Sequence, residues 1–101
     1  MTVKIVALWT KPEDTEAFDK DYEATHIPLV AALPGLSSAI YCKALNGPYH
    51  RTAELIYADM EALGGSVGSD EGQKVLADGD RLQSTYGAKL EVLTLEEQSR
   101  T

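Results

Sequence analysis

The sequence predicts an α+β protein of the ferredoxin-like type, with one four-stranded antiparallel sheet and helices on one of its faces. Three observations predict this fold. Four segments rich in β-branched and aromatic residues alternate with two segments of helical periodicity, in the order β-α-β-β-α-β. The two middle strands follow one another across a short loop and should form a hairpin. Helical crossovers of this kind share one hand, so the helices should pack on the same face.

The first strand and helix are predicted from a change of periodicity. Val3–Trp9 is rich in β-branched and aromatic residues, which is typical of a strand. Phe18, Tyr22 and either Thr25 or His26 then recur at helical spacing. The helix should therefore turn these side chains toward the sheet.

A proline interrupts this helix. Pro28 has no amide hydrogen, its ring presses on the carbonyl of Ala24, and it disfavours helical angles at Ile27. The helix is expected to end or kink near His26, with a second short helix over Pro28–Leu33.

The second half of the chain predicts a hairpin and a closing strand. The further strands are expected at Leu36–Leu45, Thr52–Ala58 and Ala88–Leu95. Pro48 prevents a simple two-residue turn, so the hairpin loop should run to Arg51 and leave His50 exposed.

Capping residues mark the starts of the helices. Asp14 precedes the first helix, Asp59 a short one, and Ser69 or Asp70 the last one. The inner face of the last helix is predicted to carry Val75, Gly79, Leu82 and Tyr86. Its solvated face is expected to carry Asp78 and Arg81.

Composition argues against several classes of partner. The 101 residues have a net charge of −7 and only nine Lys plus Arg, so nucleic acid and anionic membrane surfaces would be repelled. No apolar run approaches the length of a membrane span. The single cysteine, Cys42, cannot form an internal disulfide and is expected in the core. The start MTVKIVALW lacks a signal-peptide pattern, so one cytoplasmic domain over residues 1–101 is expected.

Both faces of the predicted sheet are apolar. In the first strand Val3, Ile5, Ala7 and Trp9 point one way, and Val6 and Leu8 point the other. Helices can cover one face only, and soluble monomers rarely expose an apolar patch of roughly several hundred Å². A second copy packed about a two-fold axis is the simplest cover, so a homodimer is predicted. A monomer whose second face is only patchily apolar is the alternative.

The chain resembles the EthD family, named for ethyl tert-butyl ether degradation, over roughly residues 3–95. The resemblance rests on KIVALWTKPEDTEAFDKDYEATHIPLVAALPGL, followed by AELIYADMEAL and SDEGQKVLAD. Its most specific part runs from Trp9 through Tyr22-x-x-x-His26-x-Pro28-Leu29 to Leu33-Pro34-Gly35. The resemblance implies a ferredoxin-like protomer paired into a dimeric α+β barrel.

The resemblance also implies a class of function. Members of the family sit among genes for oxidative breakdown of organic compounds, and the wider superfamily includes cofactor-free oxygenases, lactone isomerases, polyketide cyclases and haem-using enzymes. The implied function is to act on, or bind, a small apolar or aromatic compound, by cofactor-independent isomerisation, cyclisation or oxygenation. The alternative is a non-catalytic ligand-binding or accessory dimer for an oxygenase system. One fold hosts all of these activities, so the fold alone does not choose among them.

His26 is the candidate catalytic residue, with Tyr22 as its partner. The two lie four residues apart on one helical face, and histidine is the side chain whose ordinary pKa suits proton transfer near neutral pH. The alternative is that His26 only caps the end of the helix. The side chains expected to line a pocket beside it are Trp9, Phe18, Tyr41, Tyr57 and Tyr86.

No cofactor or metal is predicted. Glu23-x-x-His26 has the spacing of a di-iron ligand pair, but no second copy of that spacing is present. Haem bound through His26 is an alternative taken from barrel relatives, although no basic cluster is available for its propionates.

Overall fold

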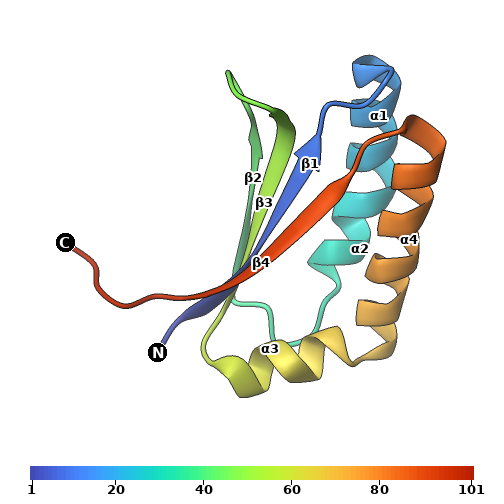
Figure 1. Ribbon diagram of the computed structural model, residues 1–101. Helices are drawn as coiled ribbons and strands as arrows, with labels where there is room; N and C mark the ends of the chain where they lie inside the picture. Colours follow the sequence, from blue (N-terminus) through green and yellow to red (C-terminus); the bar gives the residue numbers. More distant parts are fainter.

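The computed structural model describes all residues from 1 to 101 and confirms the predicted ferredoxin-like α+β fold (Figure 1). The elements are β1 (Val3–Thr10), α1 (Thr15–Asp21), the π-helical turn η1 (Tyr22–His26), α2 (Ile27–Ala31), β2 (Ser38–Lys43), β3 (Tyr49–Tyr57), α3 (Met60–Val67), α4 (Asp70–Tyr86) and β4 (Leu90–Glu96). The strands pair in the antiparallel order β2-β3-β1-β4. All helices lie on one side of the sheet, and the other side is uncovered (Figure 1).

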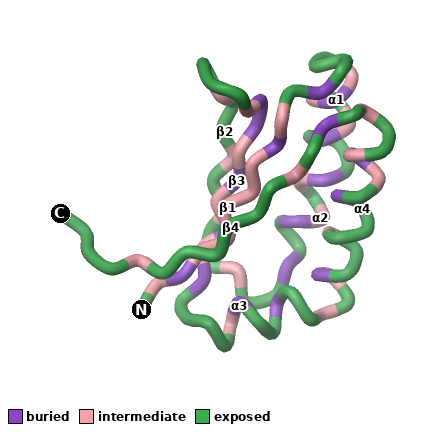
Figure 2. The backbone as a smooth tube through the Cα atoms, in the orientation of Figure 1, coloured by how far each residue is buried: buried purple, intermediate pink, exposed green.

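The helix-side face of the sheet follows the predicted alternation. In the register of β1 with β3, Val3 lies opposite Tyr57, Ile5 opposite Leu55, Ala7 opposite Ala53 and Trp9 opposite Arg51. The buried residues form two clusters on this side, in line with the buried segments that Figure 2 shows between sheet and helices. One cluster is aliphatic apart from Tyr57, and the other is built around the rings of Trp9, Phe18 and Tyr22.

The predicted caps are present at three helix starts. Asp14 accepts a hydrogen bond from the amide of Ala17 at 3.0 Å, and Asp59 accepts one from Ala62 at 2.8 Å. Of the two candidates for α4, Ser69 is the capping residue, and it accepts from the amide of Gly72. Each cap satisfies an amide that has no partner within its own helix.

A second short helix begins next to His26, as predicted, with Pro28 in its first turn, although α2 spans Ile27–Ala31 and not Pro28–Leu33. The expectation that Pro28 turns Ile27 away from helical angles is wrong. The helical path runs on through η1 into α2, and Ile27 keeps helical angles, with φ −56° and ψ −44°. The Ile27 amide donates to the carbonyl of Tyr22, five residues back. This wider turn shifts the hydrogen bonding from four residues to five, so the chain stays helical where Pro28 cannot donate.

The third strand begins earlier than predicted. It starts at Tyr49, not Thr52, so His50 and Arg51 are strand residues. The prediction that His50 lies exposed in a loop is wrong, since both side chains are buried. The reason is pairing: an irregularity at the end of β1 lets Thr10 pair with Tyr49, which extends the ladder back to the residue directly after Pro48.

The uncovered face carries apolar side chains among polar ones. Ile40, Leu93 and Leu95 are 47%, 49% and 40% exposed, and they lie around an ion pair in which Lys4 Nζ is 2.7 Å from Glu54. Cys42 is exposed, not in the core as predicted, because its place in β2 turns it away from the helices. None of the helices has the length and apolar character needed to cross a membrane.

Candidate functional site

A cavity of about 550 Å³ lies between the helix-side face of the sheet and the helices α2, α3 and α4. Fifteen of its 22 lining residues are hydrophobic. Its volume is in the range of sites for small organic molecules, and its lining favours apolar ones.

Small residues create this space. Ala7 and Ala53 lie side by side on neighbouring strands and both face the cavity. On the opposite wall α4 contributes Gly72 and Gly79, and a methyl group added at Gly79 would lie 3.6 Å from the Leu90 side chain. Larger side chains at these positions would fill the gap between sheet and helix.

The cavity opens between the edge strand β4 and the helices. Val67, Leu76 and Val92 line it and are exposed to solvent. Asp80 also lines it and is exposed, so it stands at the mouth. Apart from His26, Asp80 is the only charged or readily charged side chain in the lining.

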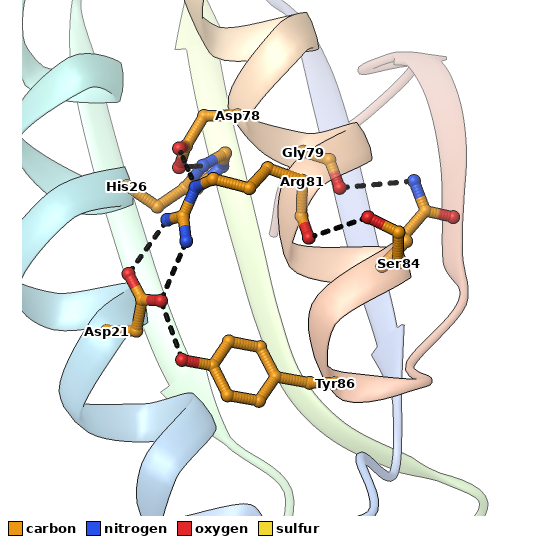
Figure 3. Close-up of polar contacts among 8 residues, drawn as sticks. Asp21, His26, Asp78, Gly79, Arg81, Ser84 and Tyr86 are labelled. Carbon is orange, nitrogen blue, oxygen red and sulfur yellow. Dashed lines mark hydrogen bonds and ion pairs between the residues drawn. The ribbon is translucent and has the colours of Figure 1, made fainter.

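His26 lies in the cavity wall and is held from behind by Asp78. Its Nδ1 is 2.9 Å from Oδ2 of Asp78, a residue of α4, and the two residues are 6% and 9% exposed (Figure 3). No protein group hydrogen-bonds its other ring nitrogen, Nε2, and that atom is not fully buried. One nitrogen is therefore engaged with a carboxylate, and the other remains free beside the cavity.

Asp78 belongs to a larger polar network, which Figure 3 shows. Arg81 Nε donates to Oδ1 of Asp78 at 2.7 Å, while its two terminal nitrogens donate to the two carboxylate oxygens of Asp21, each at 2.8 Å. Tyr86 Oη donates to Asp21 at 2.6 Å. The expectation that Asp78 and Arg81 form a solvated face is therefore wrong for Asp78, which is buried, and Arg81 is half-buried.

The charges in this network set the pKa values of its carboxyl groups. Burial raises the pKa of Asp78, but hydrogen bonds from Arg81 and His26 outweigh it and leave the pKa below its ordinary value. The hydrogen bonds from Arg81, and then from Tyr86, lower the pKa of Asp21 strongly. Both groups are carboxylates at neutral pH.

Tyr22 stacks on His26 at the cavity wall. The ring centroids are 5.5 Å apart with planes at 19°, and the Arg51 guanidinium lies 4.8 Å from the centre of the Tyr22 ring. Burial raises the pKa of Tyr22 to about 12, although the charge of Arg51 opposes this. At neutral pH the hydroxyl therefore keeps its proton, so Tyr22 can donate a hydrogen bond but is no base.

The predicted pocket-lining aromatics divide into two groups. Trp9 and Tyr57 line the cavity, and Trp9 stands edge-on to His26 with ring centroids 5.7 Å apart. Phe18, Tyr41 and Tyr86 do not line it. They pack in or against the second core cluster, beside Trp9 and Leu82.

The second histidine lies in a separate polar group. Nε2 of His50 is 2.7 Å from Oδ1 of Asp19, and Arg51 donates to the same oxygen at 3.2 Å. His50 does not line the cavity. No group of three or more His, Cys, Asp or Glu side chains is placed to hold a metal ion.

The sequence reading missed Asp78, Arg81 and Asp21. A signal was available for Asp78, which lies three residues after Val75 and four before Leu82, within the apolar stripe of its helix. A carboxylate on the buried face of a helix needs a hydrogen-bonding or charged partner, so its position in the sequence predicts a buried polar contact.

The fold and this site define a ferredoxin-like α+β protein with a small-molecule-sized apolar cavity that holds one histidine. A family model described as the EthD domain matches residues 10–85. The chain therefore belongs to the EthD family, as the sequence resemblance indicated.

Two relatives and one structure that shares only the fold illustrate the similarity. An EthD-family protein from Bacillus halodurans is 31% identical, with a TM-score of 0.87, covering 97% of this chain and 100% of that one. An uncharacterized 11.0 kDa protein from the thcB–thcC intergenic region of Rhodococcus erythropolis is 30% identical over 80 residues, 74% of this chain and 78% of that protein. SnoaB, a cofactor-independent oxygenase from Streptomyces nogalater, shares the fold at 12% identity, with a TM-score of 0.72 and coverage of 98% and 95%.

Proposed function

We propose that the protein binds a small, electrically neutral, apolar organic compound and transfers a proton at His26. The observation that carries this proposal is the position of His26, the one imidazole in the lining of a predominantly apolar cavity. A titratable group in such a cavity is a candidate for acid–base chemistry.

The charges of the cavity lining favour a neutral substrate. The charged side chain of the lining is the carboxylate of Asp80 at the mouth, and the whole chain carries a net charge of −7. An anionic compound would be repelled at the entrance and would find no lysine or arginine in the lining. A phenol, or a ketone with an acidic C–H bond, suits both the lining and the histidine.

We propose that the reaction needs no cofactor. Proton removal leaves an electron pair on the substrate as a phenolate or enolate, and return of the proton to another atom completes an isomerisation or cyclisation. Oxygenation would use dioxygen as a second substrate, and the structural neighbour SnoaB is a cofactor-independent oxygenase. A haem in this cavity would meet no basic side chain for its propionates, and the lining does not favour that alternative.

The second candidate is a binding or accessory protein without its own chemistry. The predominantly apolar lining favours it, since such a lining suits the capture of an apolar molecule for an oxygenase system.

Deuterium exchange separates the two functions without knowledge of the full reaction. The purified protein is incubated in D₂O with a panel of neutral phenols and small ketones, together with carboxylates of matched size, and exchange is followed by NMR. We expect exchange into at least one neutral ketone, its loss in His26→Ala, and its retention in His50→Gln, which keeps an amide donor for Asp19. Exchange that survives in His26→Ala would contradict the catalytic proposal, and binding without exchange would support the accessory function.

We also propose that the protein works as a homodimer. The apolar residues of the uncovered sheet face, Ile40, Leu93 and Leu95, support this, together with Val6 and Leu8 beside them. A second copy of the same face would cover them and close the two sheets into the barrel expected for this family.

A further inference from the structure

We infer that Asp78 is a positioning residue, which holds His26 in the tautomer with its proton on Nδ1 and leaves Nε2 as a proton acceptor at the cavity wall. This inference rests on the proposed function and adds the direction of the first proton transfer, which is from the substrate to His26. The neutral form of His26 then acts as a base, so the substrate must bring the proton that is transferred.

The first step of the argument is the hydrogen-bonding capacity of the two groups. An ionised carboxylate can only accept hydrogen bonds, and a neutral imidazole donates from one nitrogen and accepts at the other. Oδ2 of Asp78 lies 2.9 Å from Nδ1 of His26, so the donor must be Nδ1–H. Nε2 is then left with its lone pair and no partner in the protein.

The second step is the charge state of Asp78. Burial raises its pKa, but the pKa still lies below the ordinary value, and the largest lowering effect is the hydrogen bond from Arg81. Asp78 is therefore ionised throughout the neutral range and does not donate to His26.

The third step is the rigidity of Asp78. Its second oxygen accepts from Arg81 Nε at 2.7 Å, and the other two nitrogens of that guanidinium are fixed on Asp21 at 2.8 Å. The carboxylate is held at both oxygens, and α4 is tied to the end of α1. His26 is thus kept in one orientation, with Tyr22 stacked on its ring and Trp9 edge-on to it.

This arrangement also accounts for the charge that forms in the reaction. When Nε2 takes a proton from the O–H or C–H bond of a neutral substrate, the electron pair of that bond stays on the substrate. His26 becomes an imidazolium beside the Asp78 carboxylate, which stabilises it without taking the proton. The total charge of site and substrate is unchanged.

The tautomer can be measured without any substrate by NMR of ¹⁵N-histidine-labelled protein. The protein has two histidines, and their carboxylate partners imply opposite tautomers for the neutral rings, since His50 faces Asp19 through Nε2 and His26 faces Asp78 through Nδ1. Two-bond couplings to the ring protons identify each nitrogen. Spectra are recorded as the pH is raised until both rings are neutral.

We expect one histidine with a proton on Nδ1 and one with a proton on Nε2. In Asp78→Asn, an amide of the same shape can donate to Nδ1, so the proton of His26 should move to Nε2. In the matched variant Asp19→Asn, only the His50 signals should change. Two histidines that both carry the proton on Nε2 in the unaltered protein would overturn the inference, whether or not Asp78→Asn folds. A tautomer of His26 that is unchanged in a folded Asp78→Asn would also overturn it.

Deuterium exchange distinguishes this inference from the proposed function. If His26 is the base, Asp78→Asn should slow exchange by about a hundredfold or more at an unchanged KM. If the tautomer switches while exchange keeps its rate, His26 is not the base, and the positioning by Asp78 still stands.

Discussion

Arg81 and Asp21 form a bidentate ion pair, in which each terminal guanidinium nitrogen lies 2.8 Å from one carboxylate oxygen, although the two residues are 60 positions apart in the chain. The pair joins α4 to the last residue of α1. It also leaves Arg81 Nε free for Asp78, so one side chain organises both acids.

This geometry predicts that lysine cannot replace Arg81. A lysine ammonium is a single point of donation and cannot span both carboxylates with fixed geometry. Arg81 is half-buried, so solvent screening limits the loss, and we expect Arg81→Lys to lower the free energy of unfolding by about 1 kcal/mol. Urea unfolding measures the change. Unfolding at an unchanged urea midpoint would show that the fork is not needed.

The low pKa of Asp21 predicts a loss of stability in acid. In the folded protein the hydrogen bonds from Arg81 and Tyr86 keep Asp21 ionised at a pH where the unfolded chain already takes up a proton. The contribution to stability is complete above the ordinary aspartate pKa of about 3.9 and is lost as the pH falls through lower values.

We therefore expect Asp21→Asn to flatten the dependence of unfolding free energy on pH between about pH 5 and pH 2. Asp80→Asn is the matched control, because Asp80 is exposed and its side chain makes no hydrogen bond to the protein. An equal slope in the unaltered protein and in Asp21→Asn would be evidence against the ion pair.

The raised pKa of Tyr22 predicts a loss of stability at alkaline pH. Burial raises its pKa to about 12, so between about pH 10 and pH 12 the unfolded chain releases this proton while the folded protein keeps it. Stability should fall over that range as pH rises. Titration of phenolate absorbance in Tyr22→Phe should lack one step centred near pH 12 that the unaltered protein shows. A missing step near pH 10 would instead mean that the hydroxyl is solvated.

Two glycines of α4 predict opposite effects of the same substitution. A Cβ at Gly79 would meet Leu90 at an ordinary 3.6 Å, so Gly79→Ala should stabilise the helix by about 0.5–1 kcal/mol. A Cβ at Gly72 would overlap the carbonyl oxygens of Val67 and Ser66, and Gly72→Ala should destabilise by about 1–3 kcal/mol. Thermal unfolding of the pair tests this. The same sign of change in both would contradict the close approach of α3 and α4.

The proposed dimer makes a prediction for the uncovered sheet face. The unaltered protein should sediment as a dimer at micromolar concentration, and Leu93→Lys with Leu95→Lys should give a monomer, because charges would be buried against a partner. Met60→Lys is the control, since Met60 is 52% exposed on α3, on the helix side of the sheet. A folded monomer for the unaltered chain would remove the proposal.

Apart from the start of β3, the strands and their faces could be predicted, because local alternation determines them. The side-by-side arrangement of Ala7 and Ala53 was not predicted, because register depends on pairing between distant segments. The helical angles of Ile27, directly before Pro28, were not predicted for a different reason. The proline rules describe a helix with bonds four residues apart, whereas the chain uses a π-helical turn there.

Sequence alone predicted the two central residues of the candidate site but not the ion-pair network that holds them. His26 and Tyr22 were found by their spacing within one helix, which is a local signal. Asp78 touches His26 across 52 residues, and Asp21 touches Arg81 across 60. Ion pairs between distant segments leave no periodic trace in one sequence, so only the polar residue within the apolar stripe of α4 pointed toward them.

The alanine pair at the middle of the sheet means that the size of the bound molecule and the chemistry done on it are encoded in different parts of the chain. Replacing Ala7 or Ala53 by valine would make the cavity shallower from its floor, while His26 and Asp78, carried by helices, would stay where they are. A designer could therefore tune which compounds fit by editing two strand positions and leave the reactive nitrogen untouched.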